Sequence, residues 1–414
     1  MTTDHRLSLP GVSADYLAKA KVDRIEANSA FQFCGIRESG MVFPYFNFHG
    51  EAVEDGGIEF ARLRLDQPRG DQKYHQRSGS APHAYLPPSI WGEDKNLNNP
   101  ILVVEGEKKA LALAEEGFTA IALGGFYNFR DGTGELVPEI VEFLHYVQDP
   151  FFIFLGDQDV VFNYQFSHAA RTFGQLVAPA SVLVSCVPLA APGKGIDDCR
   201  HALGTDFKPW MVEHVYSGAV IDSKSTAGSV AWELLRLQVP TLVGMEGVKR
   251  DEARRGLSKL AAGLRGFPLE QNNVTETAEK LGVGRNIFKR LVKQENRRSV
   301  MENVAEELGG DTSKVIDLGE QPGTWTRDVL EVVGPQTYLF GDNLCDLSGG
   351  AFKPHTPASL VPRLDSKDCC RFVRVNSSGE ASRTQLSEKE TRLVLGALEQ
   401  HKKFLQPVKT LAQA

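Results

Sequence analysis

A regular alternation of strand-like and helix-like segments between residues 96 and 205 constrains the fold more than any other feature of the sequence. Fully apolar runs, such as ILVVE from Ile101 and FFIFLGD from Phe151, alternate with longer stretches in which apolar residues recur at helical spacing. Uniformly apolar runs are typical of strands that are buried on both faces of a parallel sheet. The pattern therefore predicts an α/β fold, with a parallel sheet flanked by helices.

The rest of the chain has other patterns, and its 414 residues leave room for several domains. Residues 1–95 mix short apolar runs with Gly and Pro breaks, which predicts an N-terminal α+β module. Residues 206–229 are polar and predict a linker, and residues 230–300 have helical spacing and predict a helical domain. Residues 301–414 return to short strands and turns, with one amphipathic helix, and predict a C-terminal α+β region.

Composition narrows the classes of protein. The formal net charge of -7 argues against a protein that coats nucleic acid through its overall charge, so any such contact must be local. No run approaches the roughly 20 apolar residues of a membrane helix, and the N-terminus lacks the apolar stretch of a signal peptide. We therefore expect a cytoplasmic protein with no membrane contact. The cysteines form no Cys-x-x-Cys pair, which favours reduced, structural thiols.

Acidic residues follow two strands of the predicted sheet. Glu105 ends the first strand, and Asp157 and Asp159 follow the third. Because the carboxyl ends of parallel strands line the crevice where ligands bind, these side chains should converge, and Asp157 and Asp159 would share one face of a continuing strand. Two carboxylates 4 Å apart repel by about 4 kcal/mol at an effective dielectric of 20, so a cation should neutralise them. All-oxygen ligation favours Mg²⁺ or Mn²⁺.

More charged residues lie nearby in this arrangement. Asp197 and Asp198 follow the last strand on a predicted loop, where they could hold a second metal or a metal-bound water, and Lys194 just before them is a further candidate substrate contact. Lys108 and Lys109 begin the helix after the first strand, and helix N-termini attract phosphate. We expect one of these two lysines to contact phosphate and the other to face solvent.

The order of these motifs resembles the Toprim domain of primases, topoisomerases and related nucleases: Glu-Gly after strand one, Gly-Gly after strand two, Asp-x-Asp after strand three and a late acidic pair. The resemblance implies that Glu105 is a general acid/base and that Asp157 and Asp159 bind metal. Asp197 and Asp198 match further acidic positions of the bacterial replicative primase. The alternative, in which the motif has no functional role, is an unrelated α/β sheet with Asp-x-Asp as an ordinary turn.

A longer pattern is similar to an uncharacterised Toprim-like family that is common in phage and plasmid replication proteins. It comprises VVEGEKKALALAEEG, ALGG, GDQD and GKGIDD, with RLRLDQPRGDQKYHQ upstream, and the likeness covers about residues 5–205. The chain departs from the pattern at Gly156, where relatives often have Phe, and over residues 160–164, which replace a turn of small residues. The N-terminal zinc-binding domain of bacterial primases is also missing from the sequence.

A basic segment precedes the predicted sheet. Arg62 and Arg64 alternate with apolar residues, so both should project from one face of a strand, and Lys73 and Tyr74 follow closely. Such a patch can bind single-stranded nucleic acid through phosphate contacts and base stacking. A solvated strand face explains the pattern equally well.

Residues 273–293 have the pattern of two helices joined by a turn at Gly282, with Ala278 and Phe288 packed inside and basic residues on the second helix. This is the pattern of a helix-turn-helix, although such hairpins are frequent as simple packing units. The stretch from Glu252 onward also resembles the helical region after Toprim in bacterial primases, so a structural or partner-docking bundle is favoured over DNA reading.

Three functions fit these patterns. The leading hypothesis is a primase-like nucleotidyltransferase of a mobile element, which uses nucleoside triphosphates and Mg²⁺ to make a primer on single-stranded DNA. The second is a Toprim-type nuclease, in which a metal-bound water attacks the phosphodiester. The third is a non-catalytic nucleic-acid-binding adaptor that recruits a replicative helicase through residues 230–298. The chain has no Gly-x-x-x-x-Gly-Lys-Ser/Thr loop and should not be an ATPase.

Overall fold

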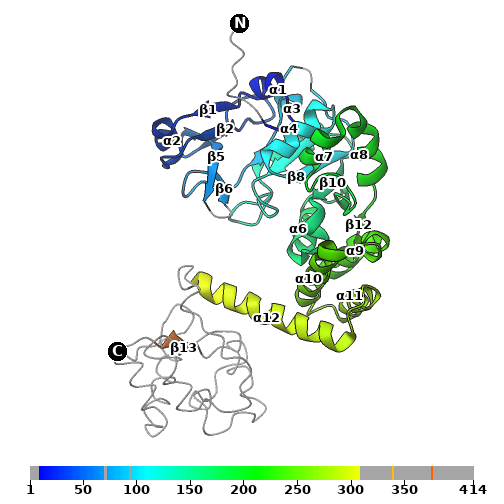
Figure 1. Cartoon of the computed structure of the whole chain (residues 1–414). Coiled ribbons are helices and arrows are strands. Elements are labelled where there is room, and N and C mark those ends of the chain that lie inside the picture. The colour runs from blue at the N-terminus through cyan, green and yellow to red at the C-terminus, as the bar shows by residue number, and fades with distance from the viewer. Residues whose placement is uncertain (1–8, 70–71, 94, 308–337, 340–373, 376–414) are drawn as a thin grey trace. The chain divides into compact units, whose positions relative to one another are not determined.

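The computed structural model describes residues 9–69, 72–93, 95–307, 338–339 and 374–375 (Figure 1). By its internal contacts the chain divides into two compact units, Met1–Asn296 and Arg297–Ala414. The first unit carries every residue of the predicted site. The described residues of the second unit are the end of α12 (Arg285–Glu307) and the antiparallel strand pair β13 (Tyr338–Leu339) and β14 (Arg374–Val375).

A six-stranded sheet forms the centre of the first unit, with the order β12-β11-β10-β8-β9-β7. The inner strands are parallel to one another and comprise β8 (Ile101–Glu105), β9 (Thr119–Leu123), β10 (Phe151–Gly156) and β11 (Ser181–Cys186). The edge strands β7 (Ala84–Tyr85) and β12 (Ala219–Ile221) are antiparallel to their neighbours. The predicted α/β fold with a parallel-containing sheet is confirmed.

Alternate residues of the inner strands pack against different layers of helices. In β10, Phe152 and Phe154 belong to the apolar cluster of α5, α6 and α9, whereas Ile153 and Leu155 belong to the cluster of α4, α7 and α8. Burial on both faces explains why these strands are apolar throughout. The helices next to the sheet are α4 (Glu107–Glu115), α5 (Pro138–Tyr146), α6 (Tyr164–Leu176), α7 (Ile196–Leu203) and α8 (Phe207–Val215) (Figure 1).

The N-terminal segment forms a second, antiparallel sheet with the order β1-β2-β5-β6. On β5, Leu63 and Leu65 pack against Ala30 and Cys34 of the adjacent helix α2. Arg62 alternates with them and so lies, with Arg64, on the opposite face, as the sequence predicted. The elements of this segment are α1 (Ala14–Lys19), β1 (Asp23–Ile25), α2 (Ala27–Cys34), β2 (Gly40–Pro44), β3 (Glu54–Asp55), β4 (Ile58–Glu59), β5 (Ala61–Arg69), β6 (Gln72–His75) and α3 (Pro88–Trp91).

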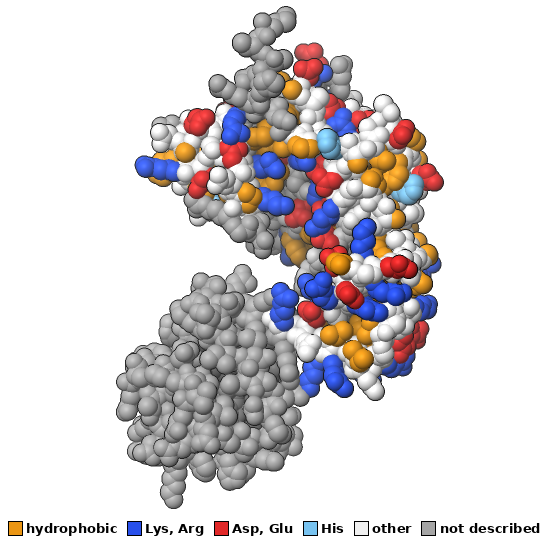
Figure 2. Space-filling view, viewed as in Figure 1, with side chains coloured by type: hydrophobic (Ala, Val, Ile, Leu, Met, Phe, Trp, Pro, Cys, Tyr) orange, Lys and Arg blue, Asp and Glu red, His pale blue; other side chains and the backbone are white. Residues whose placement is uncertain are grey.

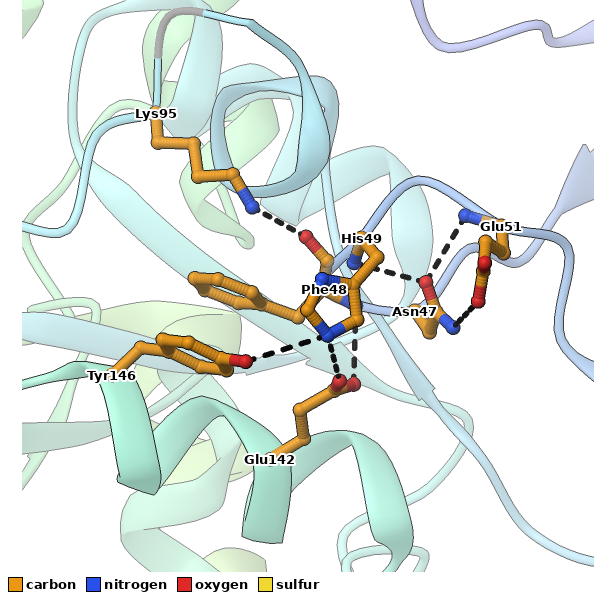
Figure 3. A network of polar contacts seen from close by, with 7 residues as sticks. All are labelled: Asn47, Phe48, His49, Glu51, Lys95, Glu142 and Tyr146. Carbon is orange, nitrogen blue, oxygen red and sulfur yellow. Dashed lines mark hydrogen bonds and ion pairs between the residues drawn. The ribbon is translucent and has the colours of Figure 1, made fainter.

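A network of polar and aromatic contacts fastens the loop before β3 to α5 (Figure 3). Nε2 of His49 lies 2.8 Å from Oε1 of Glu142, and the rings of Phe48 and Tyr146 stack with their centroids 4.1 Å apart. Lys95 donates a hydrogen bond of 2.5 Å to the carbonyl oxygen of Phe48. These contacts join the N-terminal segment to the helices of the central sheet.

The helices after the sheet continue its apolar core. Buried residues of α9 (Ala227–Val243), α10 (Gly247–Gly263) and α11 (Pro268–Lys280) belong to the same cluster as one face of the sheet. Ala278 and Phe288 are fully buried, and Gly282 turns the chain with a φ of +80°. The predicted helix-turn-helix shape is therefore present, while its role stays a prediction.

The segment predicted as a linker, residues 206–229, contains α8 and β12 instead. Phe207, Met211 and Val215 recur at every fourth position and are fully buried, which fixes α8 against the sheet. Pro209 and the Gly- and Ser-containing residues that follow the helix concealed this pattern in the sequence. The domain boundaries themselves stay predictions.

Only some of the other expectations from the sequence concern residues that the structure describes. Cys34, Cys186 and Cys199 are free and buried, as expected for structural thiols. Within the residues that the structure describes, every helix is too short or too polar to serve as a membrane span. The predicted C-terminal helix, residues 387–404, lies outside the described residues.

Candidate active site at the carboxyl edge of the sheet

The candidate site begins where β8 and β10 end. Glu105 is the last residue of β8, and the chain then turns into α4 through Gly106, whose φ of +94° is a conformation that favours glycine. β10 ends at Gly156, and Asp157 follows it. Because β8 and β10 are parallel neighbours, Glu105 and Asp157 lie at the same edge of the sheet.

Asp157 and Asp159 do not share a strand face, contrary to the prediction. The strand ends before both residues, and a 3₁₀ helix, η1 (Gln158–Phe162), starts directly after Asp157. With about three residues per turn, positions two apart lie roughly 240° apart around such a helix. The Asp157 side chain is accordingly 24% exposed and that of Asp159 62% exposed, and each has its own partner.

Asp197 and Asp198 lie in the first turn of α7, where the sequence suggested a loop. Negative side chains are stabilised near a helix N-terminus, which accounts for this placement. Asp198 accepts a hydrogen bond from the backbone nitrogen of Gly195. Asp197 is buried, and its Oδ1 atom has no hydrogen-bond partner.

Lysines neutralise three of these carboxylates. Nζ of Lys109 lies 2.7 Å from Oδ1 of Asp157, and Nζ of Lys194 lies 2.8 Å from Oδ2 of Asp159. Nζ of Lys108 lies 2.7 Å from Oδ2 of Asp197, the side chain with the orphaned oxygen. Lys108 and Lys109 are both largely buried, so the expectation that one of them faces solvent was wrong. The sequence predicted that a metal ion would neutralise these carboxylates, and in the structure lysines of the same chain neutralise them.

Of the five predicted metal ligands, two, Asp157 and Asp197, lie close enough together to bind one divalent cation. Across the described residues, no three Asp, Glu, His or Cys side chains lie together so that they could hold a metal ion. A Cβ atom at Gly195 would lie 2.7 Å from Oδ1 of Asp197, 3.1 Å from Cε of Lys109 and 3.2 Å from Oδ1 of Asp157, so both carboxylates pack closely against this glycine. Mg²⁺ commonly takes only one or two protein carboxylates, with water and phosphate completing its shell.

The environment of Glu105 and Asp157 favours their protonated forms. Burial raises the pKa of Glu105; the positive charge of Lys109 opposes this, and the negative charge of Asp157 adds to it. Burial likewise raises the pKa of Asp157, again opposed by Lys109. Within the described residues, Glu105 makes no hydrogen bond or ion pair, which leaves its carboxyl group available for proton transfer.

A buried cluster beside the site was not foreseen from the sequence. Glu107, the first residue of α4, has no exposed surface, and its Oε1 atom accepts hydrogen bonds from the Tyr45 hydroxyl at 2.7 Å and from Nη1 of Arg62 at 2.9 Å. Its neighbour Oε2 has no partner. The available signal was an acid in the first turn of the helix that begins directly after Glu105 and Gly106.

This cluster changes the interpretation of the basic segment. Arg62, predicted to contact nucleic acid, is 12% exposed and is paired with Glu107, while its guanidinium lies 5.0 Å from the ring centroid of Tyr74. Tyr74 is packed against Arg62 and the core, so neither side chain stands free on the surface. Arg64 lies opposite Tyr74 on the neighbouring strand, and Lys73 is exposed. Of the four predicted contacts, these last two remain open to a ligand.

Gly156 packs closely against residues of η1 and α6. A Cβ atom there would lie 2.6 Å from Cγ2 of Val160 and 2.8 Å from Cε2 of Phe166. The bulky residues of η1 and α6 thus fill the space that a side chain at position 156 would take. The two departures noted in the sequence, at 156 and over 160–164, are therefore parts of one packing arrangement.

Comparisons with known proteins can now be set beside this geometry. Residues 92–207 match the family model described as "Domain of unknown function (DUF3854)". No match was found among curated proteins.

Weak likenesses occur among solved structures. The Aquifex aeolicus primase (zinc-binding and RNA polymerase domains) is 13% identical with a TM-score of 0.36, and the alignment covers 67% of each chain. A DNA primase domain from Pseudomonas aeruginosa is 15% identical with a TM-score of 0.36, and 69% of this chain and 90% of that chain are covered. The RNA polymerase domain of Mycobacterium tuberculosis primase DnaG is 14% identical with a TM-score of 0.32, covering 64% and 87%. Likenesses at this level do not bear on activity.

Proposed function

We propose that the protein is a primase-like nucleotidyltransferase that depends on Mg²⁺ or Mn²⁺ and extends a primer on single-stranded DNA. One observation carries the proposal: the carboxylates of Asp157 and Asp197, each paired with a lysine, both pack against Gly195 at the carboxyl edge of the parallel strands. Such an edge is where ligands of open parallel sheets bind. The Toprim-like order of the motifs supports the assignment, and their likeness to phage and plasmid replication proteins supports a role in a mobile element.

The roles of the charged residues follow from their contacts. Asp157 and Asp197 would hold the cation, which polarises phosphoryl oxygens and offsets charge at the transferring phosphorus. Lys109 and Lys194 would exchange their carboxylate partners for phosphate oxygens of the incoming triphosphate. Glu105, whose pKa is raised by burial, would accept the proton of the primer hydroxyl.

Primer synthesis tests the proposal directly. The purified full chain is incubated with single-stranded DNA, Mg²⁺ or Mn²⁺, and labelled nucleoside triphosphates, and product is resolved by length. We expect labelled oligonucleotides from the unaltered protein and about 100-fold less, or none, from Asp157→Asn, as for other enzymes that lose one charge-stabilising group. Glu213→Gln is the matched control, since this acid is exposed on α8 and contacts none of the site lysines.

The same reagents distinguish the other two functions. Loss of a labelled DNA strand when nucleotides are withheld, abolished by Asp157→Asn, would assign the site to hydrolysis. Folded protein that binds DNA, with neither synthesis nor cleavage under any metal, would favour the adaptor and overturn the proposal. Recruitment of a helicase through residues 230–298 stays a prediction.

A further inference from the structure

A continuous strip of aromatic and basic side chains lies at the same edge of the sheet as the acids. It consists of Tyr127, Arg130, Tyr164, His168, Arg171 and Phe267, which we call the tyrosine strip. The ring centroid of His168 lies 6.0 Å from that of Tyr127 and 6.3 Å from that of Tyr164, and Tyr164 lies 5.9 Å from Phe267. All of these side chains are half-buried: Tyr127, Tyr164 and Phe267 pack in part against the apolar core and present the rest of their surface to solvent.

The fold places this strip beside the candidate active site. Tyr127 lies in the loop that leaves the carboxyl end of β9, the neighbour of β8, which ends at Glu105. Tyr164 is the first residue of α6, which follows the acidic residues of η1. Tyr164, His168 and Arg171 are spaced by four and three residues and therefore share one face of α6. Helix α6 contacts η1 as well as α9 and α10, and in Figure 1 it lies between the sheet and these two helices.

Internal contacts hold the tyrosine rings in place. The Tyr127 hydroxyl lies 3.0 Å from Nδ1 of His168 and 3.0 Å from Oε1 of Gln165. The Tyr164 side chain passes close to the backbone at Gly263, where a Cβ atom would lie 2.6 Å from Cβ of Tyr164. Rings fixed in this way lose little conformational entropy when a planar group stacks on them.

Among the residues that the structure describes, the arginines of the strip have no acidic partner. The Arg130 guanidinium lies 5.4 Å from the ring centroid of Tyr127, and it forms no ion pair with any residue that the structure describes. Arg171 bonds only to uncharged oxygens, those of Ser225 and Gln175. In contrast, the arginines and lysines of the candidate active site are nearly all paired with carboxylates. The strip therefore carries uncompensated positive charge in a chain whose net charge is -7.

We propose that the tyrosine strip binds single-stranded nucleic acid, with bases stacked on the rings of Tyr127 and Tyr164 and phosphates paired with Arg130 and Arg171. Alternating aromatic rings and unpaired cations are the combination that single strands require. Tyrosine and arginine are also enriched in protein interfaces, but positive charge that no carboxylate compensates favours a polyanionic strand. This inference deepens the proposed function, on which it rests, by assigning the path of the template next to the acids.

Binding of labelled oligonucleotides tests the strip without any catalysis. A fluorescein-labelled single-stranded 20-mer is titrated with the full chain in EDTA, without nucleotides, and anisotropy gives the affinity. Tyr127→Leu and Tyr164→Leu should each weaken binding at least about fivefold, the lower limit for loss of one stacked base. Tyr146→Leu is the matched control, since this tyrosine is 50% exposed on α5, outside the strip, and should leave the affinity unchanged.

Two further variants separate stacking from folding and from charge. Tyr127→Trp keeps a planar ring and should retain the affinity that Tyr127→Leu loses, with circular dichroism confirming that both variants fold. Arg130→Gln should lower the slope of log affinity against log salt by about 0.7, the value for one lost phosphate contact on a single strand. Duplex DNA of the same sequence should show no dependence on either ring.

The outcome is independent of primer synthesis. Asp157→Asn should bind the 20-mer as the unaltered protein does, so ring-dependent binding without synthesis would keep the strip and refute only the proposed activity. Equal affinities for Tyr127→Leu, Tyr164→Leu and Tyr146→Leu would overturn the strip, whatever the synthesis assay shows. Ring-dependent binding of duplex with no preference for the single strand would overturn it as well.

Discussion

Replacing Arg62 by methionine should destabilise the first unit far more than the loss of an ordinary ion pair. Glu107 has no exposed surface, and Arg62 supplies the positive charge that compensates it, while Tyr45 supplies only a hydroxyl. Burial opposes the charged form of Arg62, but the carboxylate of Glu107 outweighs it and raises the pKa of Arg62. Arg62→Met would leave a buried carboxylate with one neutral hydrogen-bond donor.

The magnitude follows from this burial. Removing one partner of a buried ion pair costs about 3–5 kcal/mol, because the remaining charge is neither solvated nor paired. Taking about 2 °C per kcal/mol for a unit of this size, Arg62→Met should lower the melting temperature by about 6–10 °C. Adding Glu107→Gln removes the stranded charge and keeps an acceptor for the Tyr45 hydroxyl, so the double variant should recover at least about half of the loss.

Thermal unfolding followed by circular dichroism measures all of these changes in the full chain. The matched control is Arg236→Met, which breaks an exposed pair with Glu233 on α9 and should cost less than about 1 kcal/mol. If Arg62→Met melts within about 2 °C of this control, the pair is not a significant source of stability. A double variant that melts no higher than Arg62→Met would show that the loss comes from packing and not from the unpaired carboxylate.

Three further predictions concern stability. Gly156→Ala should cost about 1–3 kcal/mol because the new methyl would lie 2.6 Å from Val160, and a truncated Val160→Ala partner should restore most of the melting temperature. Although burial opposes it, hydrogen bonds from the start of α1 and from Arg200 hold the pKa of Glu115 below its ordinary value of 4.5. The folded carboxyl therefore binds its proton less tightly than the unfolded one, so this stabilisation is present above about pH 4.5 and is lost as the pH falls through the folded pKa. Glu115→Gln should melt below the unaltered protein at pH 7, with a gap that narrows below pH 4.5; a gap independent of pH would exclude an ionic origin. Tyr146→Ala removes a ring whose centroid lies 4.1 Å from that of Phe48, and it should lower the free energy of urea unfolding by about 1 kcal/mol. Tyr146→Phe keeps the stacked ring and should leave this free energy almost unchanged.

The central sheet could be predicted because its sequence signal is local. Uniform apolar runs bounded by turn residues mark β8 and β10 before any contact is known, and the burial of both faces is the physical cause of that pattern. The helix α8 was missed for a related reason. Its three buried residues have helical spacing, but Pro209 and the Gly- and Ser-containing residues 217–229 are typical of a connector.

From the sequence alone, only those site residues could be placed whose position follows from where a strand ends. Glu105 and Asp157 lie at one edge because neighbouring parallel strands end there, and this follows from the order of elements alone. The partners of the acids did not follow, because side-chain pairing depends on helix orientation: Lys109 lies in the first turn of α4, which starts beside the end of β8, and from there it reaches Asp157. The burial of Glu107 likewise depends on a distant strand that brings Arg62 to it.

The pairing of acids with lysines has a consequence for any cation at this edge. Two carboxylates that face each other without compensation repel by a few kcal/mol and so attract a divalent ion strongly. Here Lys108 and Lys109 already compensate Asp197 and Asp157, which removes most of that attraction. A cation that binds alone must displace the ammonium groups of these two lysines from their carboxylates. A cation that binds together with a triphosphate brings phosphate oxygens, which the same ammonium groups can then contact. Under the proposed function, cation and nucleotide should therefore bind with positive cooperativity, each raising the affinity for the other by the same factor.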